Sequence, residues 1–228
     1  MSAALFLPAR CGCGAAGYLT AVPSKLDGRF EAPEHDWRFA VEPAAEPVAP
    51  PQRDYRIAVH EAGHAFFAHA LGRPLVAVTI CGQPHASYNG ASNHHAATAM
   101  ISMAADHVQR LILHRAVFRP YDHDVVASFD AVRKLKFGGC DRCLTALAIT
   151  GVAGTDAPDN VLLAAYRAIE AHAIDIIREP RTQTAIRGLA CALMRLGEIG
   201  GGEAHNILEA LDIAFGEIQL SEGKPQRA

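Results

Sequence analysis

Five consecutive residues, His60-Glu61-Ala62-Gly63-His64, carry the clearest chemical pattern in the chain. Positions four apart in an α-helix lie one turn apart on the same face, so His60 and His64 can present two imidazoles to one metal ion. Neutral imidazoles suit Zn²⁺, and Glu61 would lie beside that ion, where its carboxylate can take a proton from a zinc-bound water. The spacing therefore predicts zinc-dependent hydrolysis of a peptide bond, with His60 and His64 as ligands and Glu61 as the general base.

The residues around this motif predict a helix over residues 55–71 that leads into a strand over residues 75–80. Asp54 can cap the helix, and a Gly-Arg-Pro segment ends it. A strand beside a metal-binding helix can pair with an extended peptide, so the strand is expected to align the substrate. The residues expected to do so are Val78, Thr79 and Ile80. The alternative is an amphipathic helix that carries two incidental histidines.

A third protein ligand is needed, because catalytic zinc sites commonly use three and leave one position for water. The long metzincin form of the motif is excluded, since it needs Gly at position 67 and His at position 70, where this chain has Phe67 and Ala70. His69 lies five residues after His64, which rotates it about 140° away from the metal face. The third ligand must therefore come from elsewhere in the chain.

The chain resembles the FtsH-type zinc metallopeptidases in four blocks. The blocks are the HExxH motif with the strand after it, residues 103–112, residues 124–128, and residues 189–208. In the third block, Asp124-Val125-Val126-Ala127-Ser128 is similar to a family segment Asn-Asp-Leu-x-x-Ala-Thr, whose Asp is the third zinc ligand. The resemblance therefore implies Asp124 as the third ligand. His123 in place of the family Asn, and Ser128 in place of its Ala, are departures from the pattern.

The register of the predicted helix tests this choice. If Asp124 is the ligand, apolar residues are expected one, eight and eleven positions later, facing the core. Those residues are Val125, Val132 and Leu135. Asp122 fails the same test, because polar residues would occupy those positions. Asp124 would also open its helix, where the helix dipole favours an ionised carboxylate. Asp122 and His123 remain the alternatives.

The organisation predicted for the chain is one mostly α-helical peptidase domain over residues 54–217. A proline-rich segment, residues 1–53, reads as a flexible extension, and residues 218–228 as a C-terminal tail. The domain is expected to place a small β-sheet, at residues 75–90, beside the HExxH helix, and a helical bundle near its C-terminal end. The further helices are predicted over residues 94–114, 125–137, 144–150, 160–178, 182–196 and 203–215.

Composition limits the classes of partner. The chain has 228 residues and is 50% hydrophobic, which predicts a sizeable hydrophobic core. Its formal net charge of -3 predicts no electrostatic attraction to nucleic acid or anionic membranes. No window of eighteen apolar residues predicts a membrane span, and a cytoplasmic location is expected. No Gly-x-x-x-x-Gly-Lys-Ser/Thr loop is present, so the sequence predicts a stand-alone peptidase without its ATPase module.

The six cysteines raise the question of a second metal site. Cys140-Asp141-Arg142-Cys143 has the spacing of a zinc knuckle, and Cys11-Gly12-Cys13 could supply two further thiolates. The simpler interpretation is a loop with reduced thiols, as is usual in a cytosolic protein. A disulfide is the remaining alternative.

Together these features predict a zinc endopeptidase that cleaves peptides or unfolded proteins and needs no ATP in isolation. Zn²⁺ would be held by His60, His64 and Asp124, and Glu61 would activate the water. A separate ATPase or a homo-oligomer could deliver the substrate. The alternative hypothesis is a non-catalytic or regulatory zinc-binding module that keeps the metallopeptidase fold.

Overall fold

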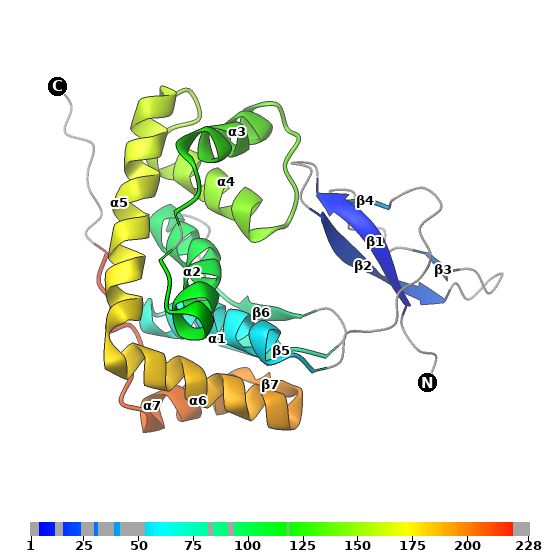
Figure 1. Cartoon of the computed structure of the whole chain (residues 1–228), viewed down its shortest axis with the longest axis vertical. Helices are drawn as coiled ribbons and strands as arrows, with labels where there is room; N and C mark the ends of the chain where they lie inside the picture. The colour runs from blue at the N-terminus through cyan, green and yellow to red at the C-terminus, as the bar shows by residue number, and fades with distance from the viewer. Residues whose placement is uncertain are drawn as a thin grey trace.

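The protein is described here by a computed structural model covering residues 5–11, 16–23, 30–31, 39–41, 53–81, 84–90, 94–117 and 119–220; in the first four ranges the backbone is described, with the side chain of Cys11. The helices form one body, and four N-terminal strands lie to one side of it (Figure 1). A small three-stranded antiparallel sheet belongs to the helical body. The predicted fold class, mostly helical with a small sheet, is confirmed at this level.

Helix α1 (Tyr55–Ala70) carries the HExxH motif through the centre of the body, and most of its residues are buried. It begins where predicted, because the Asp54 carboxylate accepts the backbone N–H of Arg56 at 2.8 Å. Helix α2 (His95–His114) packs directly on it. The two backbones approach closely at Gly63, where an added Cβ would lie 3.1 Å from the Cβ of Val108. A side chain at this position would therefore press against α2, and glycine allows the close approach of the two helices.

The small sheet lies against α1. Its central strand is β5 (Leu75–Thr79), flanked by β6 (His85–Tyr88) and β7 (Glu198–Gly200), and both pairings are antiparallel. Strands β5 and β6 confirm the sheet predicted beside the HExxH helix. Strand β7 was not predicted, and it brings the segment after the sixth helix against β5, on the side opposite β6.

The remaining helices form two packed groups around α1 and α2. Their bounds are α3 (Asp122–Arg133), α4 (Asp141–Ala153), α5 (Asp159–Arg178), α6 (Pro180–Leu196) and α7 (Gly201–Ala210). One hydrophobic core joins α1, α2, α6, α7 and the small sheet, and a second lies between α3, α4 and α5. Helix α4 begins three residues earlier than the predicted start at residue 144, and this difference matters for the site.

The N-terminal strands make a second antiparallel sheet. Strands β1 (Leu5–Cys11), β2 (Ala16–Pro23), β3 (Phe30–Glu31) and β4 (Phe39–Val41) pair in the order β3-β2-β1-β4. The prediction of a flexible extension over residues 1–53 did not anticipate these strands. At the end of β1, the buried side chain of Cys11 reaches Cys143 of α4. The sheet is thereby connected to the helical body.

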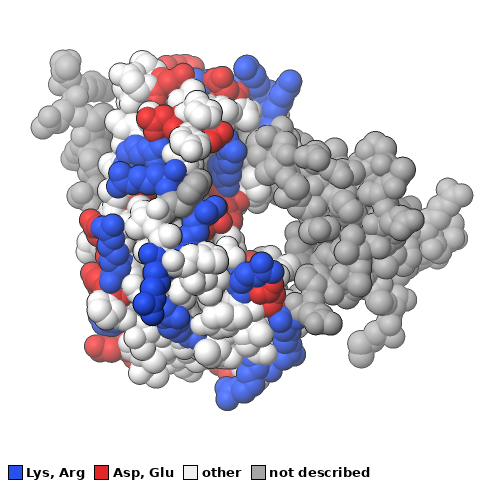
Figure 2. Space-filling model, viewed as in Figure 1, with Lys and Arg blue, Asp and Glu red and all other residues white. Residues whose placement is uncertain are grey.

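The surface of the described residues mixes both signs of charge. Figure 2 shows Lys and Arg side chains interspersed with Asp and Glu on the face viewed, in keeping with the small net charge of -3. Within the described part of the chain, no helix is both long enough and apolar enough to cross a membrane.

Candidate metal centre

Three side chains from two helices converge at the centre of the body: His60 and His64 of α1, and Asp141 of α4. Their potential ligand atoms all lie within 4.8 Å of one another. The Nε2 atoms of His60 and His64 lie 3.0 and 3.3 Å from the same Oδ2 of Asp141. Donor atoms of a tetrahedral zinc site, with bonds of about 2.0–2.1 Å, are separated by about 3.3 Å. The spacing therefore fits one zinc ion with two imidazoles and one carboxylate.

The other ring nitrogen of each histidine faces an acceptor. The Nδ1 atom of His64 lies 2.9 Å from the buried carbonyl oxygen of Ile101, so Nδ1 carries the proton donated there and Nε2 is the ring atom that faces Asp141. The Nδ1 atom of His60 lies 3.7 Å from Oδ1 of Asp106. A carbonyl or carboxylate behind the ring is the usual arrangement for metal-binding histidines, because it fixes the ring and its tautomer.

The charges at this centre are strongly coupled. Burial alone would raise the pKa of Asp141, but His64 and His60 hold it well below its usual value. Burial alone would lower the pKa of His64, but the Asp141 carboxylate raises it to about 9. At neutral pH a proton therefore lies between the imidazole of His64 and the carboxylate of Asp141. A divalent ion that binds there must displace that proton.

Glu61 lies next to this group on α1 and is only 6% exposed. Burial raises the pKa of its carboxyl group above the usual value, against the opposing effect of His64 and His60. Among the described residues its Oε2 atom finds no hydrogen-bond partner. A buried carboxylate oxygen without a partner is costly, so the site fits a group that brings a donor to Glu61, as a metal-bound water would.

The structure does not bring Asp124, the expected third ligand, into this group, and the carboxylate that meets the two histidines is that of Asp141. Asp124 lies in the first turn of α3, and its carboxylate is about half exposed beside His123, at 3.7 Å. The side chain of Arg142 instead donates to the backbone carbonyl of Asp124 and to the Ser128 hydroxyl. These bonds tie α3 to the start of α4, where Asp141 points toward the two histidines.

The alternatives for the third ligand also lie elsewhere. Asp122 pairs with Arg167 of α5, and the side chain of His123 is 79% exposed. The register test that favoured Asp124 was only partly right. Val125 and Val132 are buried as expected, but Leu135 lies beyond the end of α3 and is 78% exposed.

Asp141 had a signal in the sequence. The Gly138-Gly139 pair can end one segment, and the next acidic residue, Asp141, is the first residue of α4. The buried positions that follow have helical spacing, at Cys143, Ala146 and Ile149. Starting this helix at residue 144 excluded Asp141 from its first turn, where a carboxylate is favoured by the helix dipole.

The expected substrate strand needs a second correction. Val78 and Thr79 lie in β5, which pairs on one side with β6 and on the other with β7, and Val78, Thr79 and Ile80 are almost fully buried. A strand paired on both sides offers no edge to a peptide. Strand β6 pairs with β5 on one side and contacts α1, and its first residue, His85, is close enough to Glu61 to lower the pKa of that group.

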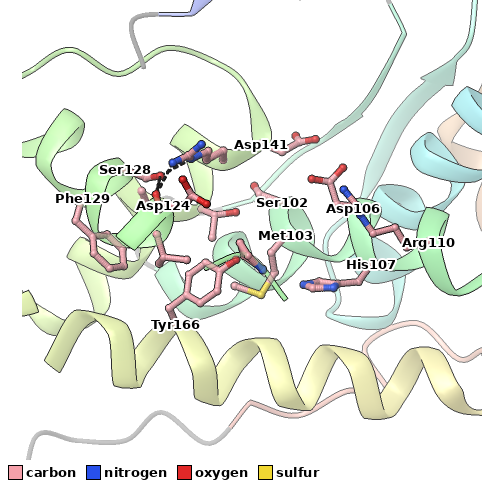
Figure 3. A pocket seen from close by; sticks show the side chains of 15 residues that line it. Ser102, Met103, Asp106, His107, Arg110, Asp124, Ser128, Phe129, Asp141 and Tyr166 are labelled. Carbon is pink, nitrogen blue, oxygen red and sulfur yellow. Dashed lines mark hydrogen bonds between the residues drawn. The ribbon is translucent and has the colours of Figure 1, made fainter. Parts of the chain in front are cut away.

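A cavity of about 280 Å³ opens beside Asp141, between α2, α3, α4 and α5 (Figure 3). Its wall is apolar at Met103 and Phe129, and Tyr166 points into it from α5. The carboxylates of Asp124 and Asp141 lie on one side of the cavity. Asp124, the residue predicted to be a zinc ligand, therefore lines this cavity. The candidate metal centre therefore adjoins a hollow large enough for an amino-acid side chain.

Comparisons with protein-family models and with curated proteins found no match for this chain. The functional inference therefore rests on the geometry at His60, Glu61, His64 and Asp141.

Proposed function

We propose that this protein is a zinc-dependent endopeptidase of the kind that its resemblance to the FtsH-type peptidases implies, with Asp141 in the role first assigned to Asp124. One observation carries the proposal. The Nε2 atoms of two histidines one helical turn apart meet the same carboxylate oxygen, at 3.0 and 3.3 Å, beside a buried carboxylate with an unpartnered oxygen. Ligand type, spacing and a neighbouring general base thus occur together in one site.

Each residue of the site has a distinct proposed role. His60, His64 and Asp141 would hold Zn²⁺, which supplies a Lewis acid that lowers the pKa of a bound water. Glu61 would be the base that takes a proton from that water and the acid that gives a proton to the leaving amine. Burial raises the pKa of its carboxyl group above the usual value, which makes its carboxylate a stronger proton acceptor than that of an exposed glutamate. The carbonyl oxygen of Ile101, 2.9 Å from Nδ1 of His64, fixes that ring from behind, whereas the mostly exposed Asp106 carboxylate lies 3.7 Å from Nδ1 of His60.

In this proposal the strand that aligns the substrate is β6, and not β5 as predicted from the sequence. An extended peptide would add to the outer edge of β6, which lies against α1 and brings His85 near Glu61. The cavity beside Asp141 would receive a side chain next to the cleaved bond, with Met103, Phe129 and Tyr166 around it. Both features suit peptides and unfolded segments, because a folded domain cannot present an extended strand there.

The decisive experiment replaces the base and keeps the ligands. Glu61→Gln retains the size of the side chain and the helix propensity, so the fold and zinc content should persist. Cleavage of an unfolded protein such as casein, without ATP, should fall at least about a hundredfold, which is the lower end of what general-base catalysis contributes. Glu209→Gln, an exposed substitution on α7, is the matched control and should cleave like the wild type.

Two results would contradict the proposal. The first is a zinc-loaded wild type that cleaves no unfolded substrate, which would favour the regulatory zinc-binding module. The second is equal cleavage by Glu61→Gln and the wild type, which would place the activity at another site.

A further inference from the structure

A second group of potential ligands lies on the other side of Asp141. The thiols of Cys11, Cys140 and Cys143 have sulphur atoms that all lie within 4.8 Å of one another. Cys11 and Cys143 are buried, and their Sγ atoms are 3.5 Å apart. Cys11 closes strand β1, whereas Cys140 and Cys143 flank the first turn of α4. Two parts of the chain, 132 residues apart, thus contribute to one cluster.

The spacing of these sulphur atoms distinguishes the possible uses of the cluster. A disulfide brings two sulphur atoms to about 2.0 Å, and no disulfide joins these cysteines. Zinc–thiolate bonds of about 2.3 Å in a tetrahedral site separate the sulphur atoms by about 3.8 Å. The separation of 3.5 Å between Cys11 and Cys143, and the limit of 4.8 Å on all three pairs, are compatible with that value.

Cys140 and Cys143 lie at the start of α4. Cys140 is the N-cap residue and Cys143 lies in the first turn, where the positive end of the helix dipole favours negative charge. Without a metal ion, the neighbouring thiol of Cys143 and burial raise the pKa of Cys140, so an ion that binds there must displace its proton. Cys140 and Cys143 are spaced as two ligands of one structural zinc ion commonly are. Cys11 adds a third sulphur from a separate sheet, which a simple turn with reduced thiols does not need.

We propose that Cys11, Cys140 and Cys143 bind a second, structural zinc ion through their thiolates. The ion would fix β1 to the start of α4. It would also hold Asp141, which lies between Cys140 and Cys143 in the chain, in the orientation that meets His60 and His64. The second site therefore positions a ligand of the first without touching substrate.

The test is cobalt substitution of the whole chain under reducing conditions. Co²⁺ bound to thiolates gives an intense sulphur-to-cobalt charge-transfer absorption that nitrogen and oxygen ligands do not give. The wild type should bind about two ions per chain and show this absorption. Cys143→Ser and Cys11→Ser should each lose the absorption and about one ion. Cys191→Ser, an exposed cysteine of α6, is the matched control and should keep both.

His60→Ala separates this inference from the proposed peptidase site. It should lose the ion at the histidines and keep the charge-transfer absorption, whether or not the protein is a peptidase. The proposal is overturned if reduced wild type shows no such absorption, or if the absorption persists when Cys140 and Cys143 are both replaced by Ser. Should a serine variant fail to fold, thiol labelling of the wild type decides: a strong chelator must raise the labelling rate of Cys11 and Cys143, and an unchanged rate refutes the site.

Discussion

Asp141→Asn should weaken zinc binding, whereas Asp124→Asn, on the neighbouring helix, should not. Asp141 lies 3.0 and 3.3 Å from the two imidazole nitrogens, whereas Asp124 lines the neighbouring cavity. Structural zinc sites bind with an apparent free energy of about 10–16 kcal/mol shared among four ligands, which gives roughly 2.5–4 kcal/mol for each. Near pH 9, loss of one ligand should therefore raise the zinc Kd about 10²- to 10³-fold, and Asp124→Asn should leave it nearly unchanged.

The loss should depend on pH, and the sign follows from His64. In the wild type the Asp141 carboxylate raises the pKa of His64 to about 9, so near pH 7 a proton competes with zinc and weakens apparent binding about a hundredfold. Near pH 9 this competition almost disappears. Asp141→Asn removes the charge that raises the pKa, so the variant lacks most of the competition at both pH values. The substitution should therefore weaken zinc binding much more near pH 9 than near pH 7.

The assay is a competition titration against a chelator of known zinc affinity at both pH values. Calorimetry in buffers of different ionisation enthalpy adds a second readout. With the thiol site already filled, zinc binding at the histidines near pH 7 should release about one proton from the wild type and fewer from Asp141→Asn. If Asp124→Asn weakens binding near pH 9 as much as Asp141→Asn does, the ligand assignment drawn from the structure is wrong. If the wild type releases no proton, the assigned coupling between Asp141 and His64 is wrong.

Two further predictions concern the scaffold that holds the site. Gly63→Val should lower the free energy of unfolding by about 1–3 kcal/mol in the presence of a chelator, because the added Cβ would lie 3.1 Å from Val108. The control is Gly202→Val, whose side chain enters open space and should change this free energy little. Equal urea midpoints for the two variants would contradict the contact at Gly63. Burial, and then His69, lowers the pKa of His205, so this residue contributes stability above its unfolded pKa near 6.5 that is lost as the pH falls through the folded value. The melting temperature of the wild type should therefore fall more steeply on acidification than that of His205→Gln, and parallel curves would exclude this source of acid sensitivity.

The sequence predicted the elements with local signals and missed those that depend on distant partners. Helix α1 was predicted within one residue, because Asp54 and the Gly-Arg-Pro segment mark its ends. Strand β7 is three residues long and becomes a strand only by pairing with β5, more than a hundred residues earlier. The N-terminal strands likewise depend on pairing with one another, and nothing local in the proline-rich segment marked them.

The same dependence on local signals applies to the proposed metal site, where two ligands lie close together in the sequence and the third is distant. His60, Glu61 and His64 follow from helix periodicity alone, since they lie within five residues. The third ligand depends on which of two adjacent helices reaches α1, and both begin with an acidic residue in the first turn. The buried positions of α3 satisfied most of the register test without placing Asp124 at the histidines. Periodicity identifies the face of a helix that is buried, but not the neighbour against which it is buried.

The start of α4 unites the two proposed metal sites. Within four residues, Cys140 and Cys143 face the thiol of Cys11 while Asp141 faces the imidazoles, and Arg142 binds α3. A carboxylate can serve as a ligand only if its helix turn is fixed more firmly than a lone surface turn would be. Packing at Cys143 and the bonds of Arg142 provide part of that rigidity, and a thiolate-bound ion would provide the rest. Loss of the thiolate ion should therefore weaken zinc binding at the histidines, although none of the three cysteines belongs to that site.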